Sequence, residues 1–437
     1  MKVALVAVGS RGDVEPYIAL GQRLVARGHS VRVASLGSFG EAVAGAGLAF
    51  HSLGDLPRRF EPRAASDGRT AFPDGRTRRD ASTLFRGVAG RALFWAFFAG
   101  MLRASLDRFI SACEGMDVVL FTRLALPVPH VAERLGIPCF AGYPVPHTPT
   151  AAFENPLYVL ADRAGRASSP RRNRATYAIE WGLTHQLSYR VLMRFRRERL
   201  GLRSVPRRAL RRHLARIVRG TLYAYSESVL PRPADWPADV QVTGYWTREL
   251  PGDFVPPADV QAFLDRGAPP ACVGFGSMKS GDPLRMGAAI GAALATVGLR
   301  AIVQSGWSRL DLSGIDGDCV LVTGEVPHAW LLPRAAVAIH HGGAGTTAAA
   351  LAAGLPSVIV PHAFDQRFWG RRIAALGCGP EPIEHRDLSA DTLATALRSA
   401  LAPDARGAAG RLGERLRAED GTGRAAELLE RWMGQAG

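Results

Sequence analysis

Short apolar segments alternate with amphipathic segments along most of the chain. Near the N-terminus, residues 3–8 are apolar, residues 9–13 form a glycine-flanked loop, and a helical apolar period follows as far as Gly28. Residues 29–35 then alternate polar and apolar positions, which is typical of a half-buried strand. This order predicts a strand–helix–strand unit and therefore a parallel sheet.

The second half of the chain repeats this alternation more regularly. Helical patterns separate its apolar segments, and three more helical patterns follow from Asp391, Ala405 and Gly423. The strands that we predict in this half are residues 272–275, 301–304, 320–322, 337–339 and 357–360. Two α/β halves of this kind predict a cleft between domains, where small-molecule sites are common.

Prolines are concentrated between residues 231 and 257, which predicts a linker between the two halves. We therefore expect an N-terminal domain over residues 1–232, a linker over 233–257, and a C-terminal domain over 258–437. The last helix of the C-terminal domain can pack back on the N-terminal domain.

Four segments of the first half need separate interpretations. Residues 56–82 are polar and without a period, so we expect a loop, whereas residues 84–110 are aromatic and amphipathic, like a helix. Residues 174–200 follow a helical pattern, and residues 223–225 open the last strand of this half.

The 437-residue chain has a net charge of +15, and this excess is concentrated in one segment. Residues 163–219 are rich in arginine, and their only acids are Glu180 and Glu198. A solvated basic helical face explains this pattern, and so does contact with an acidic acceptor or an anionic membrane surface. Nucleic acid is disfavoured as a partner because no nucleic-acid-binding motif accompanies the charge.

The cysteines and the apolar segments favour a cytoplasmic location. The five cysteines are dispersed without metal-ligand spacing, which predicts neither a disulfide framework nor a zinc site. The N-terminal apolar run is too short for a signal peptide, and residues 92–102 are too few to span a bilayer.

The strongest chemical signal lies where the apolar segment ending at Ile339 meets His340 and His341. Gly342, Gly343 and Gly345 follow, and then an alanine-rich helix begins. A strand, a glycine turn and a helix N-terminus bind phosphate, because backbone N–H groups can approach the anion and the helix dipole favours negative charge. The next strand ends before Asp365 and Gln366 on the same sheet edge, where open α/β sheets bind ligands. An anion site beside a carboxylate and an amide suits a nucleotide sugar.

HHGGAGTT at residues 340–347, DQ at 365–366 and GSRGDVEP at 9–16 together resemble the inverting nucleotide-sugar glycosyltransferases of family 1. The resemblance is to the vancomycin-group antibiotic glycosyltransferases and the sterol glucosyltransferases. It implies the GT-B fold, two Rossmann-like domains facing each other across a cleft. It also implies that the C-terminal half binds the donor and the N-terminal half binds the acceptor, without a metal or other cofactor.

The resemblance assigns roles to individual residues. Asp13 is the expected general base, and its alternative is a helix-capping residue. Asp365 and Gln366 are expected to hold sugar hydroxyls, and Val326 and His328 to line the nucleobase pocket. The residues expected at the donor diphosphate are His340, Gly343, Gly345, Thr346 and Ser277.

The acceptor pocket is the least determined part of the site. We expect it to be lined by residues of the N-terminal half: Ser10, Arg11, His147 and Trp95. His147 is also the second candidate for the general base. We expect His341 to be structural. Ala348 stands where plant-type relatives carry a ribose-binding Glu, which leaves UDP and dTDP both open as the nucleotide.

Together these features predict transfer of a hexose or deoxyhexose from a UDP- or dTDP-sugar to a hydroxyl of a lipophilic small molecule, with inversion. A bacterial natural product such as a polyketide, glycopeptide or terpenoid aglycone is the preferred acceptor. The alternatives are a membrane-associated sterol or lipid glucosyltransferase and a catalytically silent auxiliary homologue.

Two other functions are disfavoured. A nicotinamide-dependent oxidoreductase would need GxGxxG after the first strand and an acid closing the second, and the chain has neither. Asp316 and Asp318 form a DxD sequence, which can bind metal, but their glycine-containing surroundings indicate a turn.

Overall fold

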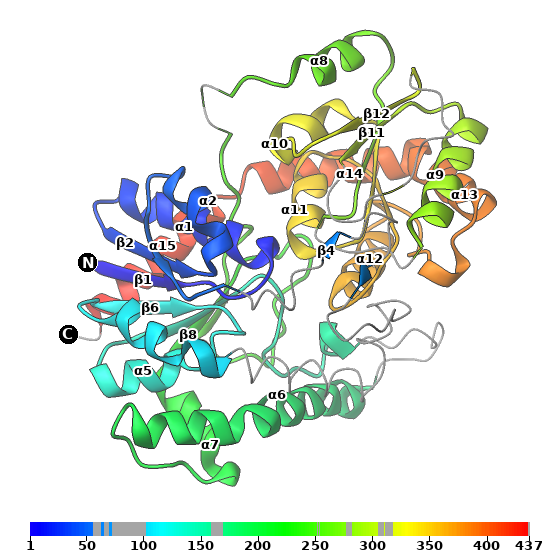
Figure 1. The fold of residues 1–437 in the computed structure, drawn as a ribbon. Coiled ribbons are helices and arrows are strands. Elements are labelled where there is room, and N and C mark those ends of the chain that lie inside the picture. The colour runs from blue at the N-terminus through cyan, green and yellow to red at the C-terminus, as the bar shows by residue number, and fades with distance from the viewer. Residues whose placement is uncertain are drawn as a thin grey trace.

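Two parallel sheets, each covered by helices, make up the molecule (Figure 1). The computed structural model describes residues 1–55, 63–64, 70–71, 102–158, 169–250, 252, 254–276, 282–304, 310 and 318–435. The predicted loop 56–82, most of the predicted aromatic helix 84–110, and Asp316 therefore lie outside the described residues.

The N-terminal sheet has the strand order β3-β2-β1-β6-β7-β8-β9, and all its paired strands are parallel. Residues 102–113 are helical. The strands are β1 (Lys2–Val6), β2 (Ser30–Ser35), β3 (Ala49–Ser52), β6 (Val118–Phe121), β7 (Cys139–Tyr143), β8 (Val218–Tyr223) and β9 (Val240–Val242). The helices are α1 (Arg11–Ala26), α2 (Gly40–Ala44), α5 (Val128–Leu135), α6 (Pro170–Glu198) and α7 (Arg207–Ile217). A separate antiparallel pair joins β4 (Arg63–Ala64) to β5 (Thr70–Ala71).

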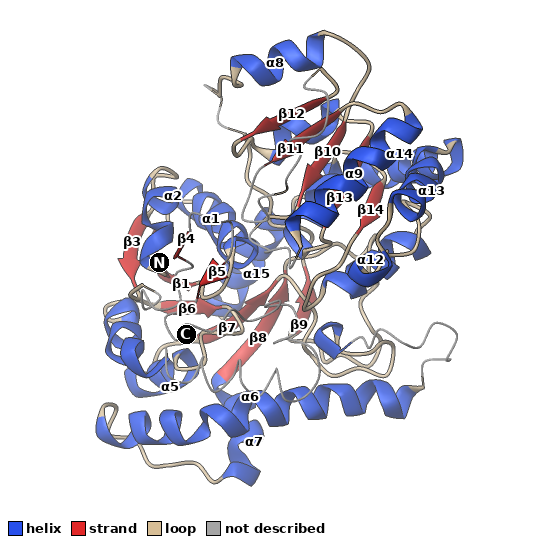
Figure 2. Cartoon of the chain, turned by 45° about the vertical axis from the view of Figure 1, so that its right-hand side comes forward, coloured by secondary structure: helices blue, strands red, loops and turns tan. Residues whose placement is uncertain are grey.

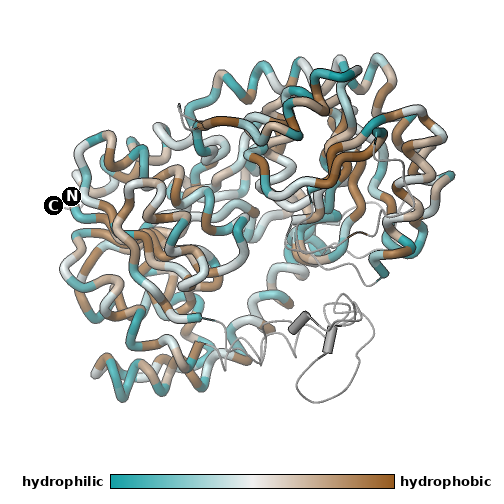
Figure 3. The backbone as a smooth tube through the Cα atoms, turned by 45° about the horizontal axis from the view of Figure 1, so that its top comes forward, coloured by the Kyte–Doolittle hydropathy of each residue, from teal (hydrophilic) through white to brown (hydrophobic). Residues whose placement is uncertain are grey.

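The C-terminal sheet has the order β12-β11-β10-β13-β14 and is also parallel throughout. Its strands are β10 (Ala271–Gly274), β11 (Ala301–Gln304), β12 (Val320–Thr323), β13 (Val337–His340) and β14 (Ser357–Ile359). The helices that follow the linker are α8 (Ala258–Asp265), α9 (Pro283–Val297), α10 (His328–Leu331), α11 (Ala344–Ala352), α12 (Gln366–Ala375), α13 (Ala390–Leu401), α14 (Pro403–Arg417) and α15 (Gly421–Gly434). Figure 2 shows the two sheets as separate layers, and Figure 3 shows their strands as hydrophobic stretches flanked by more hydrophilic helices.

Two boundaries differ from the sequence prediction. Residues 223–225 were expected to open the last strand of this half, but β8 begins at Val218 and ends at Tyr223, and β9 follows it. The early start is hidden in the sequence because Arg219, Gly220 and Thr221 interrupt the apolar pattern. The linker predicted at 233–257 includes β9, which pairs with β8 and extends the N-terminal sheet. A three-residue strand is too short to show an alternating pattern of apolar and polar residues in the sequence.

One apolar cluster joins the two sheets. Tyr223, Tyr225 and Trp236 of the N-terminal half pack with Ile359 and Trp369 of the C-terminal half, and all five are buried. Because interiors are close-packed, this shared cluster fixes the two domains relative to each other.

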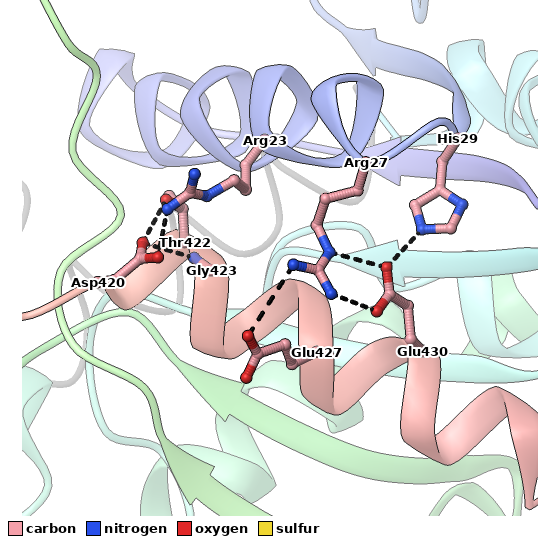
Figure 4. A network of polar contacts seen from close by, with 8 residues as sticks. All are labelled: Arg23, Arg27, His29, Asp420, Thr422, Gly423, Glu427 and Glu430. Atoms are coloured by element: carbon pink, nitrogen blue, oxygen red, sulfur yellow. Dashed lines mark hydrogen bonds and ion pairs between the residues drawn. The ribbon is translucent and has the colours of Figure 1, made fainter.

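The last helix, α15, leaves the C-terminal domain and packs on α1, so that the chain ends beside its own beginning (Figure 1). Ala425, Ala426 and Leu429 are buried in the same cluster as the β1 and α1 side chains. Glu430 forms ion pairs with Arg27 at 2.7 Å and with His29 at 2.7 Å (Figure 4). Hydrogen bonds from Arg27 and His29 lower the pKa of Glu430 from 4.5 to about 2.

No helix in the described part of the chain is both long enough and apolar enough to cross a membrane.

Glu430→Gln tests this contact. A carboxylate whose pKa falls on folding stabilises the fold above its unfolded pKa, and that gain is lost as the pH drops towards the folded pKa. We expect Glu430→Gln to lower Tm by about 2 °C between pH 5 and 8. The difference from the wild type should disappear near pH 2.

Glu427→Gln is the matched control, because Glu427 lies 3.9 Å from Arg27 and is 56% exposed. We expect it to leave Tm nearly unchanged. Equal losses in the two variants, measured by calorimetry, would contradict a specific role for Glu430.

Candidate active site

The base candidate, Asp13, lies in the first turn of α1 and faces the C-terminal domain. Helix α1 begins at Arg11, earlier than expected, and Ser10 is its N-cap. Asp13 Oδ2 accepts hydrogen bonds from the Ser10 backbone N–H at 2.8 Å and from the Ser10 hydroxyl at 3.1 Å. Asp13 is therefore a capping residue as well, and the two interpretations of this carboxylate are compatible.

Burial is the main influence on the charge state of Asp13. It raises the pKa of Asp13 from 3.8 to about 6, although the hydrogen bonds from Ser10 oppose this rise. A carboxylate with this pKa is ionised at neutral pH and is a better proton acceptor than an ordinary aspartate.

The predicted diphosphate site lies at the end of β13 and the start of α11. Gly342 has a φ of +86°, and a Cβ there would lie 2.7 Å from Ile359 Cγ2. A Cβ on Gly343 would lie 2.5 Å from His341 Nε2. These two positions therefore require glycine, for backbone conformation and for close packing respectively.

His340 is 1% exposed, and its two ring nitrogens have different surroundings. Its Nδ1 accepts a hydrogen bond from the Gly342 backbone N–H at 3.1 Å. Burial lowers the pKa of His340 well below 6.5, so the ring is neutral and its proton is assigned to Nε2. Nε2 is buried and has no hydrogen-bond partner among the described residues, which leaves a donor for a ligand.

The neighbouring positions differ in their accessibility. His341 is half-buried, and burial lowers its pKa to about 4 against the opposing effect of a hydrogen bond to the Gly274 backbone. Gly345 is exposed and Thr346 is half-buried in the first turn of α11. Ser277 lies outside the described residues.

Asp365 and Gln366, at the start of α12, are held by short hydrogen bonds. Asp365 Oδ2 accepts a hydrogen bond from the indole N–H of the buried Trp369 at 2.8 Å. Gln366 Oε1 accepts hydrogen bonds from the backbone N–H groups of His362 at 2.7 Å and Ala363 at 2.9 Å. Because the amide oxygen of Gln366 is occupied in this way, its NH₂ group is the part available to a ligand.

The charge of Asp13 acts on Asp365 across the domain boundary. The pKa of Asp365 is raised from 3.8 to about 6, mainly by burial and to a smaller extent by the charge of Asp13, against the lowering effect of the Trp369 and Ala344 hydrogen bonds. Helices α1 and α11, which belong to different domains, are in contact. The fold thus brings Asp13 of one domain close to the Asp365 group of the other.

Arg11 lies against the C-terminal domain, where we expected an acceptor contact. It forms ion pairs with Glu15 of its own helix and with Glu325, which precedes Val326. Its charge also lowers the pKa of His328, second to the effect of burial. Ser10 beside it is exposed.

The predicted nucleobase positions are also on this side of the C-terminal sheet. Val326 is buried, and its carbonyl oxygen accepts a hydrogen bond from Gln304 Nε2 at 2.8 Å. His328 is the first residue of α10.

His147 lies among tyrosines of the N-terminal domain. The Tyr223 hydroxyl accepts a hydrogen bond from the His147 backbone N–H at 2.9 Å, and the centre of the His147 ring lies 5.4 Å from that of Tyr143, edge-on. Burial lowers the pKa of His147 well below 6.5. Tyr17 connects this group to the base, because the charges of Tyr143 and Asp13 both raise its pKa, after burial. Trp95 lies outside the described residues.

Three residues of the site were not found from the sequence. Trp369, four residues after Asp365, could have been found from the i, i+4 spacing at a helix start. Phe364 has a φ of 57° and is 46% exposed, and no local pattern indicates that strain. Glu325 pairs with a residue of the other domain, and such long-range contacts leave no local signal.

Two family models match the chain. The "Glycosyltransferase family 28 N-terminal domain" matches residues 3–154, and the "Erythromycin biosynthesis protein CIII-like, C-terminal domain" matches residues 292–423. Among the described residues, no group of three or more His, Cys, Asp or Glu is arranged to hold a metal ion.

The chain is also similar to proteins of known activity and structure. It is 32% identical to sterol 3-beta-glucosyltransferase UGT80B1 of Arabidopsis thaliana, over 99% of this chain and 68% of that protein. It is 32% identical to the sterol 3-beta-glucosyltransferase of Debaryomyces hansenii, where it spans 97% of this chain but 26% of that protein. The solved structure of the glycotransferase of kitacinnamycin has a TM-score of 0.69 at 22% identity and covers 99% of both chains. Glycosyltransferase VinC, solved in complex with dTDP, has a TM-score of 0.66 at 19% identity and covers 100% of both chains.

Three findings indicate the same family: the two parallel sheets, the motifs of both halves, and 32% identity with a relative that is matched over two thirds of its length. The chain belongs to the family 1 glycosyltransferases with the GT-B fold.

Proposed function

We propose that the chain transfers a hexose or deoxyhexose from a UDP- or dTDP-sugar to a hydroxyl of a lipophilic acceptor, with inversion and without a metal. The observation that carries this proposal is the approach of Asp13 to Asp365 across the domain boundary. A base from the acceptor half and a sugar-holding carboxylate from the donor half then act on the same substrate.

In this mechanism the acceptor oxygen attacks the anomeric carbon directly, so the configuration at that carbon inverts. Asp13 takes the proton of the acceptor hydroxyl as the new carbon–oxygen bond forms. The bond from the anomeric carbon to the diphosphate breaks, and the electron pair leaves with the diphosphate.

The leaving diphosphate gains charge, and neutral donors of the chain stabilise it. These are the Nε2–H of His340 and the backbone N–H groups at the N-terminus of α11. Asp365 accepts hydrogen bonds from sugar hydroxyls and the NH₂ of Gln366 donates to another, which places the anomeric carbon for attack.

Two acceptor classes have support. The identity with sterol glucosyltransferases over nearly the whole chain supports a sterol or a similar polycyclic lipid. The composition and motifs support a bacterial natural product such as a polyketide, glycopeptide or terpenoid aglycone. Either acceptor has an apolar body and a reactive hydroxyl, and we propose that the reaction takes place in the cytoplasm.

A donor-binding experiment comes first. UDP or dTDP should raise Tm with concentration, and NAD should not, because only a ligand that binds the folded state stabilises it. His340→Ala should weaken nucleotide binding about fivefold, the effect of one lost hydrogen bond of about 1 kcal/mol. Asp365→Asn is the control: it should weaken binding of the nucleotide sugar and leave the free nucleotide unaffected. A shift with NAD alone would contradict the proposal.

Asp13→Asn should separate catalysis from stability. With sterol and polyketide acceptors, product formation should fall by about 10²–10⁴-fold, the usual contribution of a general base. Because folding raises the pKa of Asp13, its stabilising effect is present below pH 3.8 and is lost as the pH rises through about 6. Asn should therefore raise Tm by about 2–4 °C at pH 7.5, with no gain below pH 4. Unchanged turnover would remove Asp13 from the mechanism.

The pH profile gives an independent test of the base. In the wild type, kcat/KM should fall about tenfold per pH unit below pH 6, because a protonated carboxyl cannot accept the proton. Asp13 and Asp365 interact, so the profile reports the apparent pKa of the pair. Asp365→Asn should keep an acidic limb and raise KM for the donor. A wild-type rate that stays constant down to pH 4.5 would contradict a carboxylate base. Nucleotide binding without turnover on any acceptor would indicate a silent homologue.

A further inference from the structure

Helix α7 carries five arginines on one exposed face, which we call the α7 arginine face. It consists of Arg207, Arg208, Arg211, Arg212 and Arg216, all exposed. The opposite side of the helix carries Leu210, Leu214 and Ile217, which belong to or pack on the N-terminal core. The amphipathic pattern therefore divides α7 into an apolar side facing the protein and a cationic side facing solvent.

The positive charge of this face is not neutralised by the protein. None of its five arginines forms an ion pair within the described part of the chain. Between residues 169 and 219 the only exposed acid is Glu198, and Arg194 pairs with it at 2.7 Å. Arginines at i, i+4 spacing repel each other along α7, and an anionic surface would relieve this repulsion.

The face is connected to the acceptor half of the cleft through α6. The Arg211 guanidinium lies 5.8 Å from the centre of the Trp181 ring, and that ring stacks on His185 at 3.5 Å. Glu180 and Thr184, which directly precede Trp181 and His185 in the same helix, bind Arg123. The charge of Arg123 in turn lowers the pKa of His147, after burial.

Figures 1 and 2 both show α6 and α7 along the edge of the N-terminal domain that is far from α8 and α9 of the donor-binding domain. A surface bound at this edge would lie beside the acceptor half and leave the donor half open to solvent. A lipophilic acceptor is concentrated in membranes. An anionic lipid surface would therefore both complement the positive charge of the face and contain the acceptor.

We propose that the α7 arginine face docks on the surface of a membrane that contains anionic phospholipid, and so holds the acceptor half of the cleft where lipophilic acceptors reside. The location of the acceptor in the membrane rests on the proposed function, whereas the charge of the face does not. Attraction of basic side chains to anionic lipid is screened by salt, so binding should depend on ionic strength.

Vesicle sedimentation of the full chain tests this proposal. Wild type should bind vesicles of phosphatidylcholine with 30% phosphatidylglycerol and not vesicles of phosphatidylcholine alone, and 0.5 M salt should release it. The variant Arg208→Gln/Arg212→Gln/Arg216→Gln should bind about 100-fold more weakly, since each basic residue contributes about fivefold.

The matched control removes three exposed arginines from α14, a helix of the other domain: Arg406→Gln/Arg411→Gln/Arg415→Gln. It lowers the net charge equally and should bind the anionic vesicles like the wild type. An equal loss in the two variants would overturn the proposal, because net charge alone would then explain binding.

Two further measurements separate this proposal from the proposed function and from another partner. The α7 variant should keep the nucleotide-dependent rise in Tm, which also shows that it is folded. If the wild type binds nucleotide but does not bind anionic vesicles, only the membrane proposal is overturned. If it binds the vesicles but no nucleotide, only the proposed function is overturned. Tight binding of duplex DNA at 0.15 M salt through the same arginines, without vesicle binding, would assign the face to nucleic acid.

Discussion

The cluster of apolar side chains shared by the two domains determines the geometry of the site. Trp369 belongs to this cluster and is buried between the sheets, and its indole N–H holds Asp365. Tyr223 belongs to it as well, and its hydroxyl holds the backbone of His147. Polar groups of both half-sites are thus attached to the same apolar contact. Because cores resist small changes in volume, a change in this packing would shift Asp365 and the backbone at His147 together.

The return of α15 to α1 supplies the second constraint. Asp13 lies on α1, and α1 is held by ion pairs and apolar contacts from the C-terminal end of the chain. Asp13, the base that we propose, is therefore positioned by both halves of the sequence. The approach of Asp13 to Asp365 has an electrostatic cost: burial raises the pKa of both carboxylates, and the charge of Asp13 adds to the rise at Asp365. That cost is useful in a base, because an aspartate with its ordinary pKa of 3.8 would be a weak proton acceptor.

The sequence was sufficient for the features that depend on local chemistry. The alternation of apolar strands and helices predicted both parallel sheets, and the glycines after His340 predicted a strand–turn–helix unit. Features that depend on pairing between distant segments were not accessible. Strand β9 has three residues and depends on pairing with β8 and on burial of Val240 and Val242 in the shared cluster. The Arg11–Glu325 contact joins residues of different domains. The sequence predicts a later start for α1, because an aspartate after a glycine-rich loop is typical of a cap, whereas Asp13 is the third helical residue.

The distribution of charge separates recognition of the donor from the net charge of the chain. A protein with a charge of +15 and an anionic substrate would be expected to bind it with arginines. The diphosphate site that we propose instead uses the neutral His340 and the N-terminus of α11, while the five arginines of the α7 arginine face form no ion pair among the described residues. Neutral hydrogen-bond donors interact modestly with the bound nucleotide sugar and more strongly as charge develops on the leaving oxygen. This difference is what lowers the reaction barrier. A fixed positive charge at the diphosphate would also hold the nucleotide product, so neutral donors at this position favour its release.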